Sequence, residues 1–189
     1  IKMTSKVAIC NKALIKLGAS LINSLDEGSE NADTLNAIYD TVRDAELRKH
    51  PWNFAIKRVE LAASGTEPLF GYQTQYPMPT DCLRILPTAE TNTLDWKIEG
   101  QNILTNDDGA LPLVYVSRET DTEKYDSAFV DALACALAVE MCERRTQSNQ
   151  NAVQMREDYK TSIREARKAN AFENVSAFAP IDSWLTARY

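Results

Sequence analysis

Few side chains in this sequence of 189 residues could carry out chemistry. The chain has one histidine, His50, which excludes a zinc site built from several histidines. Cys82 is the cysteine that could pair with His50 as a nucleophile with its base. However, the stretch TDCLRIL around Cys82 resembles neither a nucleophile turn nor a helix N-terminus. We therefore expect His50, which precedes Pro51, to be a charged or hydrogen-bonded cap at a helix end, with a Cys-His hydrolase as an alternative.

The acidic residues are scattered, and the stretch that could suggest a metal site is NDDG at 106–109. An EF-hand loop needs further oxygen ligands at a set spacing, and the residues around 106–109 do not supply them. Asp-Gly is more typical of a hairpin turn. The six glycines form neither GxGxxG nor a P-loop. The sequence therefore predicts no cofactor, no metal and no enzymatic activity.

The charge of the chain argues against tight binding to DNA. The net charge is −6 and the pI is about 4.9, so non-specific attraction to phosphates is expected to be weak. Basic residues occur as isolated pairs, such as those at 57–58 and 144–145, without interleaved aromatic residues. Trp52 and Phe54 alternate along a predicted strand, which favours core packing over base stacking.

The cysteines and the hydropathy indicate a soluble protein of a reducing compartment. The four cysteines form no CxxC pair, and three of them lie in apolar stretches with helical periodicity. No segment approaches the roughly 20 apolar residues that span a bilayer, so no membrane contact is expected. The N-terminus also lacks the apolar run of a signal peptide.

Two amphipathic helices are predicted before Pro51. Residues 4–18 have apolar side chains at helical spacing and end at Gly18, where a left-handed C-cap belongs. Residues 29–49 begin at Ser29, a good N-cap, and Pro51 ends this helix by disfavouring helical geometry in the residue before it. The predicted buried stripes are Val7, Cys10, Leu14 and Leu17 in the first helix and Leu35, Ile38, Tyr39 and Val42 in the second.

In residues 52–118 the apolar side chains recur at every second position, which predicts a small antiparallel sheet. The alternation slips by one residue near Lys57 and Arg58, and we expect a β-bulge there, within a strand that starts at Trp52. Further strands are expected at 70–77, on both sides of a turn at 99–102, and at 111–118.

Helical periodicity returns after residue 125. The stretch 125–145 has a wide, alanine-rich apolar stripe, which predicts the central helix because small residues let a neighbour approach closely. Residues 151–170 form the last helix, with one apolar and one charged face. The predicted fold is α+β: a four-helix bundle core (1–51 and 119–173), an antiparallel β insertion between helices 2 and 3 (52–118) and an extended C-terminal arm (174–189).

The closing stretch AFAPIDSWLTARY, at 177–189, is again apolar and aromatic. Pro180 prevents the last helix from continuing. The stretch could pack on its own domain, or it could leave the bundle near Asn174 and anchor in a groove of another subunit. The candidate contact residues of such an arm are Phe178, Ile181, Trp184, Leu185, Arg188 and Tyr189.

Residues 8–55, AICNKALIKLGASLINSLDEGSENADTLNAIYDTVRDAELRKHPWNFA, resemble the start of the tail tubular protein A family, the head-to-tail adaptors of short-tailed bacteriophages. The stretches YPMPTDCLRI (76–85), RETDTEKYDSAFVDALACALA (118–138) and WLTAR (184–188) resemble later parts of the family in the same order. In the first stretch, the residues that carry the resemblance are Asn11, Leu14, Leu17-Gly18, Ser24-Leu25, Asn31-Ala32-Asp33, Arg43, Trp52 and Phe54.

The resemblance implies a dodecameric ring of this chain in the virion neck, assembled in the host cytoplasm. It would bind the portal protein above and the tail nozzle protein below, and DNA would pass through its lumen without sequence-specific contacts. We expect the arm 174–189 to bind the portal, and the β region to face the nozzle. The tail-side residues proposed on this basis are Glu99, Asn102, Asp107 and Asp108.

Two other interpretations remain open from the sequence. A connector of a long-tailed phage would have a similar helical design but would meet a stopper protein in place of a nozzle. A helical interaction module without any viral role would also fit the composition.

Overall fold

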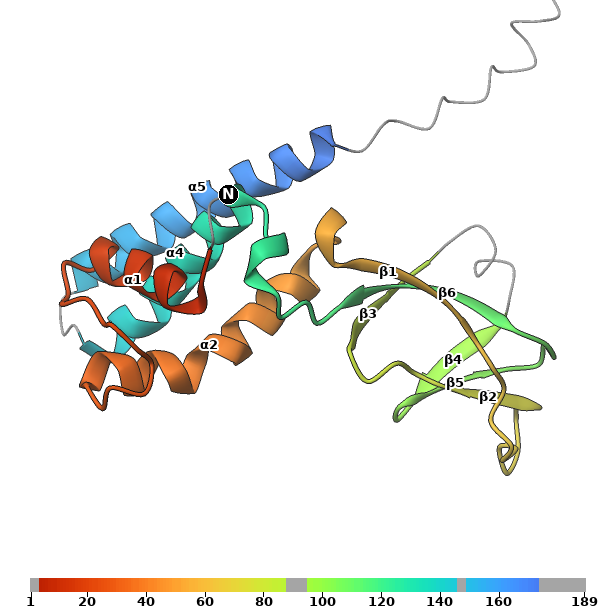
Figure 1. Ribbon diagram of the computed structural model, residues 1–189. Helices are drawn as coiled ribbons and strands as arrows, with labels where there is room; N and C mark the ends of the chain where they lie inside the picture. The colour runs from red at the N-terminus through yellow and green to blue at the C-terminus, as the bar shows by residue number, and fades with distance from the viewer. Residues whose placement is uncertain (1–3, 88–94, 146–148, 174–189) are drawn as a thin grey trace, which may run out of the picture.

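The computed structural model describes residues 4–87, 95–145 and 149–173, with side chains for all of these except 143–145, 149 and 150. The fold is α+β: four helices, with two small antiparallel three-stranded sheets between the second and the third helix. The helices gather on one side of the molecule and the sheets extend from the other (Figure 1). The predicted class and the position of the β region in the chain are confirmed.

The first helix, α1 (Lys6–Lys16), begins at the N-cap Ser5, whose side chain accepts a hydrogen bond from the Ala8 N–H. Gly18 follows the helix with φ at +62°, the left-handed conformation predicted for it. The loop after α1 is held by Asn11, whose side-chain amide donates to the Ile22 carbonyl at 2.8 Å and accepts from the Ile22 N–H at 2.9 Å. One asparagine thus fixes the path of the chain towards the next helix.

The second helix, α2 (Glu30–Lys49), is capped by Ser29 as predicted, with the Ala32 N–H donating to its hydroxyl. Leu35 and Tyr39 are buried, whereas the other two residues of the predicted stripe are only partly buried. The helix ends at His50, whose ψ of 143° is extended because Pro51 follows.

The third helix, α4 (Ser127–Arg145), is central, as its alanine-rich stripe predicts. It contacts α1, α2 and α5 (Asn149–Phe172). Phe129, Leu133, Leu137 and Met141 are fully buried along α4. The predicted inner face of α5 is confirmed, with Ile163 and Ala166 buried and Met155 and Tyr159 packed against the core.

The chain enters the β region through a turn, and the strand predicted from Trp52 is wrong at its start. Trp52 instead precedes a short 3-10 helix, η1 (Asn53–Ala55), and β1 covers Ile56–Leu61. The Trp52 indole is fully buried among the helices, where its Nε1 donates to the Glu46 carbonyl at 3.0 Å. The β-bulge predicted near Lys57 and Arg58 is wrong, because β1 pairs with the last strand of the region in unbroken register from Ile56 to Leu61. An irregularity of register lies instead in β3 (Cys82–Leu86), between Cys82 and Arg84.

The strands form two sheets where one was predicted. The remaining strands are β2 (Thr74–Pro77), β4 (Trp96–Glu99), β5 (Asn102–Thr105) and β6 (Leu111–Ser117). The first sheet has the order β1-β6-β3 and the second β2-β5-β4. The turn predicted at 99–102 and the strand near 111–118 are confirmed, but the strand predicted at 70–77 is shorter. Five buried residues, Tyr76, Ile103, Leu111, Leu113 and Tyr115, form a core of their own in the β region.

Candidate interaction surfaces

His50 and Cys82, the residues with most catalytic potential in the sequence, have environments that suit structural roles. His50 Nε2 lies 3.1 Å from the side-chain amide of Asn170, and burial lowers the pKa of the imidazole, with a further effect from Arg167 and Arg84. The histidine is therefore a hydrogen-bonded helix cap that favours the neutral form. Burial and the neighbouring Asp81 raise the pKa of the Cys82 thiol, which opposes thiolate formation.

The NDDG stretch forms a turn, but the hairpin predicted for it is wrong, because the strands that it joins, β5 and β6, lie in different sheets. Gly109 has φ at +122°, and Tyr76 donates its hydroxyl proton to the Gly109 carbonyl at 2.7 Å. Thr105 donates its hydroxyl proton to the Asp107 carboxylate at 3.1 Å and accepts from the Asp107 N–H at 3.2 Å. Within the described ranges, no group of three or more histidine, cysteine, aspartate or glutamate residues could hold a metal ion.

Two loops meet at the end of the β region farthest from the helices (Figure 1). The first, 62–73, joins β1 to β2, and the second, 106–110, joins β5 to β6. Leu61 pairs with Leu111, and Thr74 pairs with Thr105, so the strands bring the ends of the two loops together. We call this pair of loops the β tip.

The β tip exposes two large apolar side chains. Leu69 is 97% exposed and Phe70 is 87% exposed, and the two residues are adjacent in the chain. Single exposed apolar residues are ordinary, so this adjacent pair is the candidate contact site of the β region. Leu69 was not predicted as a contact residue, and Phe70 was predicted to begin the strand at 70–77, whereas β2 begins at Thr74 and leaves Phe70 in the loop. Pro68 and Gly71, which flank the pair, are typical turn residues and were the available signal.

The charge of the β tip is uniformly negative. Glu67, Asp107 and Asp108 are exposed, and neither loop contains a lysine or an arginine. Of the four residues predicted for the tail-side surface, Asp107 and Asp108 lie in the β tip. Glu99 and Asn102 pair with each other at the opposite end of β5, next to the turn at 100–101. The structure therefore divides the predicted surface between two ends of one sheet, about 10 Å apart at the rise of a strand.

The β region is joined to the helices by polar contacts around Asp81. Lys57 donates to one carboxylate oxygen of Asp81 at 2.7 Å, and the Tyr115 hydroxyl donates to the other at 3.0 Å. Burial alone would raise the pKa of Asp81, but these two donors hold it below its usual range. The Arg118 N–H donates to the Asp81 carbonyl at 2.7 Å, and Arg118 Nε donates to Asp44 on α2 at 2.6 Å.

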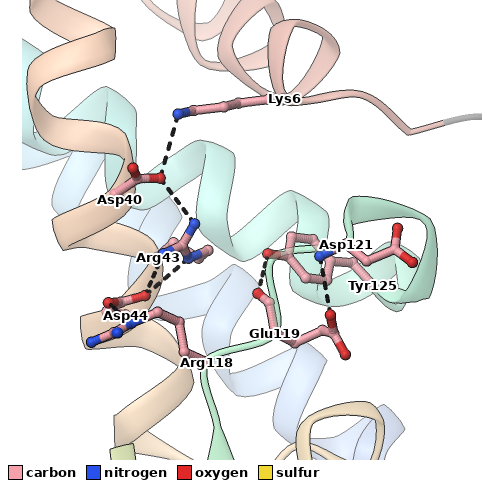
Figure 2. A network of polar contacts seen from close by, with 8 residues as sticks. All are labelled: Lys6, Asp40, Arg43, Asp44, Arg118, Glu119, Asp121 and Tyr125. Carbon is pink, nitrogen blue, oxygen red and sulfur yellow. Dashed lines mark hydrogen bonds and ion pairs between the residues drawn. The ribbon is translucent and has the colours of Figure 1, made fainter. Parts of the chain in front are cut away.

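The same contacts continue into the helices through Arg43 (Figure 2). The Arg43 side chain is 8% exposed and lies between two carboxylates. It donates to Asp40 at 2.9 Å and, through Nε and Nη2, to Asp44 at 2.9 and 2.7 Å. Lys6 of α1 forms an ion pair with Asp40 at 3.4 Å. Asp44 thus binds both Arg43 and Arg118, and the chain of contacts runs from α1 through α2 to the end of β6.

A groove of about 310 Å³ lies between α2, α4 and α5. Glu46 is 2% exposed in its wall, and its carboxylate accepts hydrogen bonds from Lys49 at 2.6 Å and from Tyr159 at 2.9 Å. The buried carboxylate is therefore satisfied by two donors, which accounts for it as a structural contact between α2 and α5. The groove is otherwise lined by Ala37, Ile38, Thr41, Val42, Ala45, Ala136, Val139 and Glu140.

The candidate portal-binding residues Phe178, Ile181, Trp184, Leu185, Arg188 and Tyr189 lie outside the described residues. Glu173, the last described residue, lies close to the start of the β region. Asn53 of η1 donates to the Asn170 carbonyl and to the Glu173 carboxylate. Within the described part of the chain, no helix has the length and apolar character needed to cross a bilayer. No protein-family model matches the chain, and no curated protein matches it.

Proposed function

We propose that the protein is a head-to-tail adaptor of a bacteriophage virion, of the kind that the tail tubular protein A family provides. In this proposal, copies of the chain form a ring, with twelve as the expected number, between the portal and the tail nozzle, and DNA passes through the lumen. The four helices form one bundle, and residues 174–189 extend as an arm to the portal. The acidic balance of the chain suits a lumen that does not retain DNA, because like charges repel phosphates.

The observation that carries the proposal is the ordered set of family-like residues together with the places these residues occupy. Asn11 holds Ile22, and Asn31 donates to the Ser20 carbonyl at 2.9 Å, so both asparagines secure the loop between α1 and α2. Arg43 binds Asp40 and Asp44, and Asp44 also binds Arg118 at the end of β6. Trp52 fills the core at the turn between them. The resemblance therefore falls on residues that determine the architecture.

A second support is the way the two parts of the molecule are joined. An adaptor must transmit the position of one neighbour to the other, which requires its two binding parts to be held together. The contacts from Lys6 through Arg43 and Arg118 to Asp81 provide such a connection. The exposed apolar pair of the β tip provides a surface on the part that this proposal directs towards the tail.

Removal of the arm tests the proposal. We expect a chain lacking 176–189 to stay folded, because the two core clusters of the helices and of the β region are built from contacts among residues 7–166, and to lose binding to purified portal rings. The measurement is native mass spectrometry or sedimentation of the chain mixed with portal, in which the full-length chain should form a ring on the portal.

A second variant replaces Trp184 and Tyr189 by alanine in the full-length chain, so that the length of the arm is kept. This variant should also bind the portal weakly, because aromatic side chains supply much of the binding energy at protein interfaces. A full-length chain that never associates with portal, or a truncated chain that assembles normally, would contradict the proposal and the role of the arm, respectively.

A further inference from the structure

The β tip presents an apolar pair that the fold of this chain does not use. The side chains of Leu69 and Phe70 are almost fully exposed, whereas Tyr76 and Leu111 nearby are buried in the core of the β region. Exposure of a leucine and a phenylalanine side by side forgoes the gain from their burial. An exposed apolar pair of this kind marks a contact with a partner.

Hydrogen bonds fix part of each of the two loops. The Ser64 N–H donates to the Gln75 carbonyl at 2.8 Å, and the Thr66 N–H donates to the Ser64 hydroxyl at 3.2 Å. In the other loop, the Tyr76 hydroxyl holds the Gly109 carbonyl at 2.7 Å. Binding therefore does not have to order these parts of the loops first, which lowers the entropy cost of association.

Charge indicates the chemistry of the partner. Glu67 lies two residues from Leu69, and Asp107 and Asp108 lie in the second loop, whose ends pair with the ends of the first; neither loop contains a lysine or an arginine. Three carboxylates repel the phosphates of DNA. They also disfavour a symmetric contact between two β tips, because that contact would place like charges opposite each other. The complementary surface is an apolar pocket with lysine or arginine at its rim, on a different protein.

We propose that the β tip inserts Leu69 and Phe70 into an apolar, basic-rimmed pocket of the tail nozzle protein. This inference rests on the proposed function, since it names the side chains that make the tail-side contact. It replaces the four-residue surface predicted from sequence by Leu69 and Phe70, with Asp107 and Asp108 at the rim. Glu99 and Asn102, at the other end of β5, lie outside this contact.

The experiment uses the full-length chain bound to portal rings and the purified nozzle protein of the same virus as the probe. Leu69→Ser combined with Phe70→Ser should weaken nozzle binding by about 100-fold, because two fully buried apolar side chains are lost. The matched control is Ile15→Ser combined with Leu21→Ser, which changes two residues that are 65% and 56% exposed in the helical part. The control should bind the nozzle as the wild type does, and both variants should bind the portal normally.

Charge and proximity give two further readouts. Asp107→Lys combined with Asp108→Lys should weaken nozzle binding at low salt and reduce its dependence on salt concentration, because rim charges act mainly through screened, long-range attraction. A photoreactive Phe70→p-benzoylphenylalanine variant should crosslink to apolar residues of the nozzle protein.

The outcomes separate the inference from the proposed function. If the wild-type chain joins portal and the Leu69/Phe70 variant recruits the nozzle with wild-type affinity, the inference is wrong and the adaptor proposal stands. A crosslink from position 70 to a second copy of the chain, or a wild-type chain on portal that never binds the nozzle, also overturns it. If the wild-type chain does not join portal, the proposed function fails.

Discussion

The contact around Arg43 yields the sharpest prediction for stability. We consider Arg43→Met, which keeps a long apolar side chain in place and removes the guanidinium. The substitution deletes three hydrogen bonds, one to Asp40 and two to Asp44. Alanine would add a cavity to the loss of charge, so methionine isolates the polar contribution more cleanly.

The loss in the free energy of unfolding depends on how well water and other side chains replace the guanidinium around Asp40 and Asp44. Removing one partner of a fully buried ion pair costs about 3–5 kcal/mol. Here Asp40 is 63% exposed and readily hydrated, whereas Asp44 is 23% exposed and keeps Arg118. We therefore expect Arg43→Met to lower the free energy of unfolding by about 2–3 kcal/mol. For a chain of this length, Tm should fall by roughly 5–10 °C.

Urea unfolding followed by circular dichroism measures the change, with a double-mutant cycle for the pair. Arg43→Met and Asp44→Ala should together cost clearly less than the sum of the two single variants, because they remove the same contact. The control is Arg164→Met on the exposed face of α5, which should change stability by less than about 0.5 kcal/mol. If Arg43→Met is as mild as Arg164→Met, or if the two changes are additive, the reasoning about this network is wrong.

The remaining predictions concern two titrating groups. His50 is the one histidine of the chain, and burial lowers its pKa, so its NMR titration should have a midpoint below the ordinary value of about 6.5. Stability should then decrease as the pH falls below 6.5, because the unfolded chain binds the proton more readily, and Arg167→Gln should raise the midpoint only in part, since burial remains. Burial and the Asp81 carboxylate raise the pKa of Tyr115 to about 12. The absorbance change at high pH that Tyr115→Phe removes should therefore centre near pH 12, and stability from this group should persist below pH 10 and disappear above it. A midpoint of His50 at or above 6.5, or a Tyr115 that ionises near pH 10, would contradict these assignments.

Several elements of this protein follow from local sequence alone. Ser5 and Ser29 cap their helices because a serine hydroxyl can accept from an N–H three residues later, and Pro51 ends α2 because its ring disfavours helical geometry in the preceding residue. The alanine-rich stripe of α4 predicts a central helix because small side chains allow close packing on several sides. These features depend on residues that lie within one or two helical turns of each other in the sequence.

The β region shows where local patterns mislead. Trp52 continues an alternation that resembles a strand, but its indole is buried among the helices, and this packing imposes a 3-10 turn before β1. The division of six strands into two sheets depends on which strands pair. β6, for instance, pairs with both β1 and β3 from distant parts of the chain. Alternation records which side of a strand is buried and does not specify its partner.

The candidate interaction surface also combines features that the sequence predicts with features that depend on the tertiary structure. The sequence by itself determined the acidic balance, the lack of a second histidine and the turn character of 106–109, because these are properties of composition and of short segments. Only the tertiary structure decided that the ends of 62–73 and 106–110 come together and that Leu69 and Phe70 remain exposed. It also separated Asp107 and Asp108 from Glu99 and Asn102. Exposure and proximity depend on contacts between segments that are far apart in the chain, and no local pattern encodes them.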